Sequence, residues 1–420
     1  MENNNMSTLY DEAKTRFMSV FGDPDIEFVR APGRVNLIGE HTDYNGLSVL
    51  PMALDREIAI ALTANSEPSV ELTNIKDTFP PVKFDLSDNI QPYETGHWGN
   101  YAKAASQAIW GWAAANHPQS LPLKGYRGCV AGSVPSGSGL SSSSALVVAT
   151  ALALVHVNKL PIPKPDLADL LAKGERYVGT EGGGMDQAAS ILSQKGYALK
   201  IDFFPLRTTP VKVPSGCSIV VANSLVIADK TGGALDAYNR RVSECRLGLS
   251  LLKDMVRDTH PQAQSAALLK DFSETVPQWA DLIQNLPDDV DGLKPKMRVR
   301  HVLTEGNRVE LAADSMQRND AGDLGRLMNE SHESCANDYE ISCPELDELV
   351  AALRNAGALG ARLTGAGFGG CTVSLVRTAD VGTLLNQVWE SYYAKRGINS
   401  QRRDEVLFAC SPAAGAGVLE

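Results

Sequence analysis

The sequence predicts an α+β protein with two domains, and three observations lead to this fold class. The chain has 420 residues, which is more than a single hydrophobic core usually organises. Strand-like runs and longer helical patterns occur in both halves of the chain. Prolines gather between residues 205 and 214, just before a new strand-like run at residues 217–222. We therefore expect an N-terminal domain of residues 1–208 and a C-terminal domain of residues 209–420.

The composition is typical of a soluble globular protein, with 43% apolar and 21% charged residues. A net charge of −11 argues against a nucleic-acid partner. Residues 1–21 contain no apolar run of signal-peptide type, and the longest apolar stretch, residues 145–157, is too short to span a bilayer. The seven cysteines are scattered without a Cys-x-x-Cys pair, which favours reduced thiols. We expect a cytoplasmic protein without a membrane partner; a monomer is the expected state, with self-association left open.

The first third of the chain is expected to begin with a helix and to continue as strands and a second helix. The expected elements are a helix at residues 11–21, strands at 27–29, 47–50 and 56–62, and a helix at 102–115. Trp98 and Tyr101 lie at the start of that second helix. Their rings could stack on a planar base, although an aromatic side chain near a helix start more often belongs to the core.

Four polar side chains lie close together between the turn signals at residues 32–33 and 45–46. They are Arg34, Glu40, His41 and Asp43. Carboxylates accept hydrogen bonds from hydroxyl groups, whereas arginine and histidine can donate them. The segment therefore suits a ligand with many hydroxyls. The alternative is a solvated loop, which is the more frequent explanation for any single charged residue.

A loop rich in glycine and serine at residues 132–144 leads directly into an apolar segment, residues 145–157, which is long enough for a buried helix. Glycines allow close approach to the backbone, and the unpaired amides of a first helical turn carry partial positive charge. No acidic residue lies in that first turn, so the sequence predicts a phosphate-binding site here. A flexible linker before a core helix is the alternative.

Two acidic residues follow this loop in positions that suit a functional site. Residues 165–178 form an amphipathic helical pattern in which Glu175 lies on the apolar face. A buried carboxylate needs a partner, and either a magnesium ion or a neighbouring Arg or Lys would serve. Asp186 follows three consecutive glycines, which leave room for a bulky group against the backbone. An aspartate after glycine is also ordinary turn chemistry.

The second half is expected to contain a strand at residues 217–222 and helices at 238–253, 299–317 and 344–355. Ser342 and Glu345 have the spacing of a capping box for the last of these helices. Gly365, Gly367 and Gly370 match the G-x-G-x-x-G dinucleotide fingerprint. A strand pattern follows them where that fingerprint requires a helix, so we predict a glycine hairpin beside a ligand.

Four segments, in this order along the chain, resemble the GHMP kinase superfamily and within it the galactokinase branch. They are Gly-Arg-Val-Asn-Leu-Ile-Gly-Glu-His-Thr-Asp-Tyr-Asn at 33–45, Pro-Ser-Gly-Ser-Gly-Leu-Ser-Ser-Ser-Ser-Ala at 135–145, Gly-Gly-Gly-Met-Asp-Gln at 182–187, and Leu-Thr-Gly-Ala-Gly-Phe-Gly-Gly at 363–370. The resemblance implies a ribosomal-protein-S5-domain-2-like N-terminal domain, a ferredoxin-like C-terminal domain and an active site in the cleft between them. It also implies ATP, Mg²⁺ and transfer of the γ-phosphoryl group to the anomeric (C1) hydroxyl of galactose, a step of galactose metabolism.

The same resemblance implies a role for each matching residue. Arg34 and Asp186 would be the catalytic pair, and it is open whether Asp186 removes the hydroxyl proton or only aligns it. The residues implied to bind the sugar are Glu40, His41, Asp43, Gly184 and Tyr238. The residues implied to bind the nucleotide are Trp98, Gly137, Ser138, Gly139, Leu140, Ser141, Ser142 and Ser143. Ser143 and Glu175 would be the magnesium ligands.

Three alternative functions stay open at this point. Segments at residues 179–186, 239–246 and 342–347 resemble N-acetylgalactosamine kinases at least as much as galactokinases, whereas the segment at 41–46 favours galactose. A regulator that binds sugar and ATP without turnover is the second alternative, although the serine-rich loop is intact, which favours catalysis. A kinase of mevalonate or homoserine type is the third, although acidic residues suit neutral hydroxyls better than a substrate carboxylate.

Overall fold

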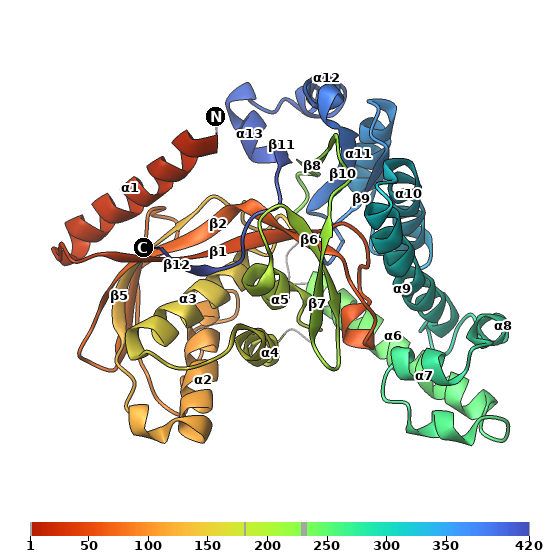
Figure 1. Cartoon of the computed structure of the whole chain (residues 1–420), viewed down its shortest axis with the longest axis horizontal. Helices are drawn as coiled ribbons and strands as arrows, with labels where there is room; N and C mark the ends of the chain where they lie inside the picture. The colour runs from red at the N-terminus through yellow and green to blue at the C-terminus, as the bar shows by residue number, and fades with distance from the viewer. Residues whose placement is uncertain (1, 180–181, 228–232, 420) are drawn as a thin grey trace.

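The N-terminal half of the chain builds a six-stranded sheet in the computed structural model, which describes residues 2–179, 182–227 and 233–419 (Figure 1). The strand order is β12-β1-β2-β5-β3-β4, and every neighbouring pair is antiparallel except β3 and β5. The strands are β1 (Glu27–Asn36), β2 (Pro51–Ala64), β3 (Ser69–Asn74), β4 (Val82–Asp85), β5 (Tyr126–Gly132) and β12 (Gly417–Leu419). Thr180 and Glu181, which belong to the glycine-rich segment before Asp186, lie outside the described residues.

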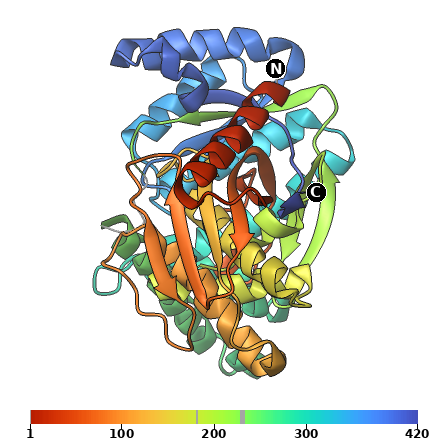
Figure 2. The same ribbon diagram turned by 90° about the vertical axis from the view of Figure 1, so that its left-hand side faces the viewer.

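Helices cover both faces of this sheet, and the alternation of side chains along β2 explains how. Ile58 and Ile60 point to the face that packs against α2 (Gly99–Asn116) and α3 (Ser142–Asn158), whereas Ala59 and Ala61 point to the opposite face. Their small side chains leave room for α1 (Glu2–Phe21), which lies across that opposite face (Figure 2). The sheet is therefore enclosed by apolar contacts on both sides.

The predicted core helix after the glycine–serine loop is confirmed as α3, which begins three residues earlier than expected. All of its residues from Ser144 to Leu154 are buried, because β1 and β2 lie on one side of it and α2 and α5 (Met185–Leu192) on the other. The position of α3 therefore fixes the loop before it, since the helix cannot rotate within its packing.

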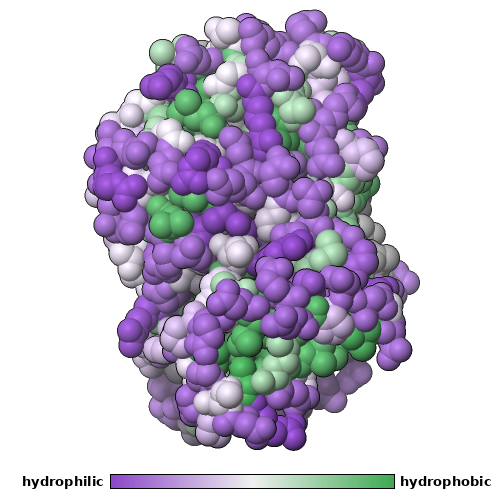
Figure 3. All heavy atoms as spheres, turned by 90° about the vertical axis from the view of Figure 1, so that its right-hand side faces the viewer, coloured by the Kyte–Doolittle hydropathy of each residue, from purple (hydrophilic) through white to green (hydrophobic). Residues whose placement is uncertain are grey.

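The C-terminal half builds a four-stranded antiparallel sheet and most of the remaining helices. The strand order is β11-β8-β10-β9, with β8 (Cys217–Asn223), β9 (Gly360–Leu363), β10 (Cys371–Arg377) and β11 (Leu407–Cys410). The helices are α6 (Gly233–Met255), α7 (Leu269–Thr275), α8 (Trp279–Gln284), α9 (Pro295–Gln317), α10 (Ala321–Asn337), α11 (Pro344–Asn355), α12 (Val381–Val388) and α13 (Arg403–Val406). The face of the molecule on the side of α7 and α8 is largely hydrophilic, with apolar side chains in separate patches (Figure 3).

Further short elements connect these layers. They are α4 (Lys164–Gly174), the ribbon β6 (Tyr197–Asp202) and β7 (Arg207–Lys212), and the turns η1 (Asp43–Asn45), η2 (Pro118–Ser120), η3 (Glu175–Val178), η4 (Pro261–Ser265), η5 (Thr378–Asp380), η6 (Trp389–Tyr393), η7 (Ala394–Arg396) and η8 (Ser400–Arg402). The boundary expected between residues 208 and 209 falls inside β7, and this division of the chain stays a prediction. β12 returns the end of the chain to the first sheet by pairing with β1.

Three local expectations are corrected by the structure. Residues 47–50 are not a strand, because Val49 pairs with Ile201 whereas the Leu50 amide donates to Ile38, so no continuous ladder forms. The helical pattern at residues 165–178 divides into α4 and the 3₁₀ turn η3. The capping box is absent, because the residue before α11 is Cys343 and Ser342 instead donates to the Asp347 side chain. Among the described helices none is both long and apolar enough to cross a lipid bilayer.

Candidate active site

Two cavities lie side by side at the start of α3, and Ala366 of the glycine hairpin lines both. The larger cavity has a volume of about 290 Å³ and lies between the glycine–serine loop and the start of α2. The smaller cavity has a volume of about 40 Å³ and is lined mainly by charged side chains and glycine backbone. The glycine hairpin was predicted from the strand pattern after Gly370, and the antiparallel pairing of β9 and β10 confirms it.

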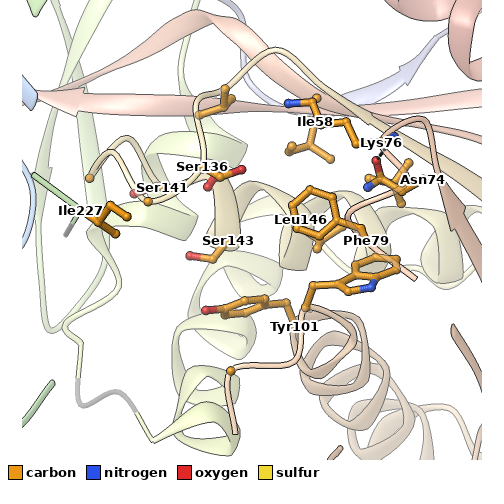
Figure 4. Close-up of a pocket in the computed structure, with 18 of the residues that line it drawn as sticks. Ile58, Asn74, Lys76, Phe79, Tyr101, Ser136, Ser141, Ser143, Leu146 and Ile227 are labelled. Atoms are coloured by element: carbon orange, nitrogen blue, oxygen red, sulfur yellow. Dashed lines mark hydrogen bonds between the residues drawn. The ribbon is translucent and has the colours of Figure 1, made fainter. Parts of the chain in front are cut away.

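The larger cavity has a polar end and an aromatic end (Figure 4). Ser136, Ser141 and Ser143 lie at the polar end, where the loop is shaped by residues in the left-handed region. Gly137 and Gly139 have φ values of 65° and 75°. The loop thus keeps its backbone close to the cavity at the N-terminus of a 17-residue helix, where amide groups have no helical partner. This geometry suits a phosphate group.

The aromatic end of the larger cavity is formed by Phe79, Trp98 and Tyr101. The rings of Phe79 and Trp98 meet edge to face with centroids 6.1 Å apart. The indole Nε1 of Trp98 donates to the Pro80 carbonyl at 2.9 Å, so the ring is held in place. Asn74 also lines this end and adds a hydrogen-bonding amide. A flat apolar group with polar edges, such as a nucleotide base, suits this end.

Two residues of the loop do not present their side chains to the larger cavity. The Ser138 hydroxyl donates to the Pro135 carbonyl at 2.6 Å, and the side chain is buried. Leu140 is fully buried, and its carbonyl accepts from the Arg34 amide at 3.1 Å. Their structural part is therefore to hold the loop in shape and to attach it to β1. Gly137, Gly139 and Ser141–Ser143 do line the cavity.

The smaller cavity is centred on an ion pair between Arg34 of β1 and Asp186 of α5. Nη2 and Nε of Arg34 lie 2.7 and 2.8 Å from Oδ1 of Asp186, and both side chains are almost fully buried. Nη1 of Arg34 donates to the Gly139 carbonyl at 2.6 Å, which links the pair to the loop of the larger cavity. Ser141 donates to Oδ2 of Asp186 at 2.5 Å. The pair therefore lies where the two cavities adjoin.

Asp43 faces the same cavity and is buried against the glycines before α5. A side chain at Gly183 would place its Cβ 2.5 Å from Cγ of Asp43, so only glycine allows this approach. Burial and the neighbouring Asp186 raise the pKa of Asp43 to about 6, with burial the larger cause. Gly184, with a φ of 103°, begins α5 directly before Met185 and Asp186. The glycine run thus brings two carboxylates together in one cavity.

Glu40 and His41 also line the smaller cavity, but their polar atoms hold the glycine hairpin. Oε1 of Glu40 accepts from the Gly365 amide at 2.8 Å and from Nη1 of Arg362 at 3.2 Å. Nε2 of His41 lies 3.1 Å from the Ala366 carbonyl. The solvated-loop alternative is wrong for this segment, since Arg34, Glu40, His41 and Asp43 are all buried.

Tyr238 of α6 also lines the smaller cavity. Its ring lies 4.9 Å from the His41 ring between centroids. Burial, followed by the charge of Asp43, raises the pKa of Tyr238 well above its ordinary value, so the hydroxyl keeps its proton. It is therefore a hydrogen-bond donor beside a cluster of acceptors.

Glu175 lies at the start of η3 and lines the smaller cavity, whereas Ser143 lines the larger one. The hydroxyl of Ser144 lies 2.8 Å from Oε1 of Glu175 and 3.3 Å from Oδ2 of Asp186. Within the described ranges no group of three or more His, Cys, Asp or Glu side chains is arranged to hold a metal ion. Any cation here would therefore need oxygen ligands from a bound substrate as well.

Sequence reasoning missed several residues of both cavities and of the layer behind them. They are Asn74, Lys76, Phe79, Ile227 and Ala366 in the lining, and Tyr44 and Tyr339 behind His41. Tyr44 stands within the signature segment, so its position was a usable signal. The same holds for Ala366, which lies within the glycine-rich motif at 363–370, whereas the other residues lie on separate segments that only the fold brings together.

Comparison with known proteins places these motifs in a family. Residues 15–64 match the galactokinase galactose-binding signature, residues 100–194 the GHMP kinases N-terminal domain, and residues 312–395 the GHMP kinases C-terminal model. The galactokinase of Dictyostelium discoideum is 34% identical to this chain, with 98% of the chain and 94% of that protein covered. The galactokinase of Chloroflexus aggregans is 36% identical, with 98% and 97% covered. Similarity therefore extends along almost the entire chain.

Solved structures agree with these matches. The crystal structure of Lactococcus lactis galactokinase complexed with galactose superposes with a TM-score of 0.82 at 30% identity, covering 99% of this chain and 100% of that one. The Methanococcus jannaschii mevalonate kinase superposes with a TM-score of 0.62 at 18% identity, covering 92% and 98%, a likeness that shows the fold alone. The α+β prediction is confirmed. With full-length relatives above 30% identity and both kinase domains matched in order, the chain belongs to the galactokinases of the GHMP kinase family.

Proposed function

We propose that the protein transfers the γ-phosphoryl group of ATP to the C1 hydroxyl of galactose. The observation that carries this proposal is the buried Arg34–Asp186 pair, which lies between a cavity shaped for phosphate and a base and a cavity lined by carboxylates. Phosphoryl transfer depends mainly on positioning the reactants and on cations near the developing charge. The Arg34–Asp186 pair, fixed where the two cavities adjoin, supplies the positioning and the positive charge.

The chemistry follows from the geometry of this pair. Asp186 is within reach of a hydroxyl in the smaller cavity and either removes its proton or aligns it for attack. Arg34, held by Asp186 and the Gly139 carbonyl, supplies a fixed positive charge beside the acceptor oxygen. Asp43 and Tyr238 provide an acceptor and a donor for the other hydroxyls of the sugar.

Ser143 and Glu175 are the residues proposed to hold Mg²⁺ together with the ATP phosphates. One hydroxyl and one carboxylate fit this ion, because Mg²⁺ usually takes few protein ligands and keeps phosphate and water oxygens. Gly182 leaves space in front of Oε2 of Glu175, since a Cβ there would lie only 3.3 Å away. When bound, Mg²⁺ offsets charge on the phosphates.

Galactose is the proposed sugar because the relatives matched over the full chain are named galactokinases and residues 15–64 match a galactose-binding signature. We also propose that the protein works in the cytoplasm as a monomer. All seven cysteines are free, which supports a reducing compartment.

Side-by-side turnover assays test the proposal. The full chain would be incubated with ATP and Mg²⁺ and with galactose, N-acetylgalactosamine, arabinose or galacturonate in turn, and ADP release and the product NMR spectrum recorded. We expect ADP release with galactose and a phosphate at C1. Faster turnover of N-acetylgalactosamine would reassign the substrate. Binding of galactose and ATP without ADP release would replace the kinase with a sugar-sensing regulator.

A further inference from the structure

A row of hydrogen bonds runs behind the smaller cavity, through groups that the proposed chemistry does not use. Oη of Tyr44 lies 2.8 Å from Nδ1 of His41, and Oη of Tyr339 lies 2.7 Å from Oη of Tyr44. Sγ of Cys245 lies 3.1 Å from Oη of Tyr339. Tyr339 is fully buried and Tyr44 half-buried, and neither is among the described residues that line the two cavities of the site.

The donor and acceptor of each hydrogen bond in this row follow from the contact between His41 and the Ala366 carbonyl. The Ala366 carbonyl can only accept, so Nε2 of His41 carries the hydrogen of that contact. In a neutral imidazole Nδ1 is then an acceptor, and it accepts a hydrogen bond from the Tyr44 hydroxyl. Tyr44 in turn accepts from Tyr339, and Tyr339 accepts from the Cys245 thiol. Burial raises the pKa of both phenols well above the ordinary value and that of Cys245 to about 11, so all three groups keep their protons.

The end of the row lies on the wall that the two cavities share. Ala366 lines both cavities, and its carbonyl is held by His41. The hairpin around it is packed tightly on the loop of the larger cavity, because a Cβ at Gly365 would lie 2.6 Å from the Gly139 carbonyl oxygen. A shift of the His41 ring would therefore move a wall that lines both cavities.

We propose that Tyr339 and Tyr44 form a hydroxyl relay that holds the His41 ring against the Ala366 carbonyl and thereby couples sugar binding to nucleotide binding. This inference rests on the proposed function, since it takes galactose and ATP as the two ligands. Tyr44 and Tyr339 act as positioning residues through His41. By linkage, each ligand then changes the affinity of the other by the same factor.

Calorimetric titration of the full chain tests the relay. The affinity for the Mg²⁺ complex of a non-hydrolysable ATP analogue would be measured without and with saturating galactose. We expect galactose to tighten nucleotide binding by about 10-fold in the unsubstituted protein, and the factor to fall below about 2-fold in Tyr339→Phe. Tyr44→Phe should lower it in the same way, and it serves as the second variant if Tyr339→Phe does not fold.

Tyr393→Phe is the matched control. Its hydroxyl is also buried, donating to the carbonyl of Asn223 at 2.7 Å, so the substitution removes a comparable hydrogen bond in a different part of the apolar core from Tyr339. We expect an unchanged coupling factor. Equal coupling in Tyr339→Phe and the unsubstituted protein would overturn the relay, and so would loss of coupling in Tyr393→Phe. Absence of galactose binding in the unsubstituted protein would instead refute the proposed function.

Discussion

The smaller and the larger cavity are built in different ways, although they adjoin. Buried charged side chains shape the smaller cavity, and each is fixed by another charge or by a backbone group. The larger cavity is shaped by glycine backbone at one end and by apolar and aromatic side chains at the other. In the smaller cavity, stabilisation of the reacting groups depends on a few single charges. In the larger cavity, binding energy is the sum of many weak contacts. Substitutions should therefore lower the rate sharply in the smaller cavity and change affinity gradually in the larger one.

The largest effect is expected from Asp186→Ala. The variant should keep its fold and lose turnover by about 10³-fold or more, because it removes the group that orients or accepts the hydroxyl proton. ADP release with galactose measures the rate, and circular dichroism checks the fold. Glu57→Gln is the control, since it weakens the buried pair with Arg30, 2.8 Å long, and neither of these two residues lines either cavity. Near-native turnover in Asp186→Ala would remove this residue from the proposed mechanism.

Asp43→Asn should separate function from stability. The loss of a charged acceptor should weaken galactose binding by roughly 10- to 100-fold. The same change should raise the free energy of unfolding at pH 7–8 by about 3 kcal/mol, because the ionised carboxylate is unfavourable in this buried position. Calorimetry and thermal unfolding measure the two effects. A variant that binds galactose normally, or that is less stable, would contradict this expectation.

The pH dependence of galactose binding sharpens the same contrast. The pKa of Asp43 rises from 3.8 to about 6 in the folded protein, so folding favours the protonated form. Stability linked to this group is therefore greatest at low pH and is lost as pH rises from 3.8 through 6. The affinity for galactose should instead decrease at low pH, because the protonated carboxyl is a poorer acceptor. Below pH 6 it should fall by up to about tenfold per pH unit. In Asp43→Asn this dependence should disappear, and its persistence would assign it to another group.

Trp98→Ala should have a moderate effect confined to the larger cavity. Stacking of a base on an aromatic ring contributes about 1–3 kcal/mol, so the KM for ATP should rise by roughly 10-fold. The KM for galactose should stay within about twofold, because the indole lies at the end of the larger cavity away from Asp186. Steady-state kinetics with each substrate varied measures both values. Equal changes in the two KM values would show that the cavities do not act separately.

The smallest effect is expected from Ser138→Ala. This hydroxyl points to the Pro135 carbonyl and away from the larger cavity, so turnover should change by less than about twofold. Ser143→Ala, at the start of α3, should instead raise the Mg²⁺ concentration needed for half-maximal rate. If Ser138→Ala lost as much rate as Ser143→Ala, the shape of the loop, and not a single hydroxyl, would determine the turnover rate.

The sequence was most informative where a physical constraint is local. The apolar run after the serines predicted α3, and the strand pattern after Gly370 predicted the hairpin. The sequence singled out Arg34 because charged residues crowd around it, and Asp186 because three glycines precede it. In the structure these two side chains lie 2.7 Å apart.

The rest depends on contacts between distant segments. Nothing near Glu40 indicates that its carboxylate accepts from Gly365, 325 positions further along the chain. Residues 47–50 have strand-like side chains, but their hydrogen-bond partners lie on two different segments. Ser342 has capping-box spacing, yet it donates to the Asp347 side chain, and Cys343 precedes α11 without a side-chain capping hydrogen bond. For Glu40 and for residues 47–50, the hydrogen-bond partners are ones that only the complete fold provides.

A crystal structure with galactose and a non-hydrolysable ATP analogue tests most directly that the two cavities serve one phosphoryl transfer. We expect the sugar in the smaller cavity with its C1 hydroxyl against Asp186, the base near Trp98, and the γ-phosphate over the loop from Gly137 to Ser143. A nucleotide bound away from this loop, or a sugar whose C1 hydroxyl points away from Asp186, would contradict that arrangement.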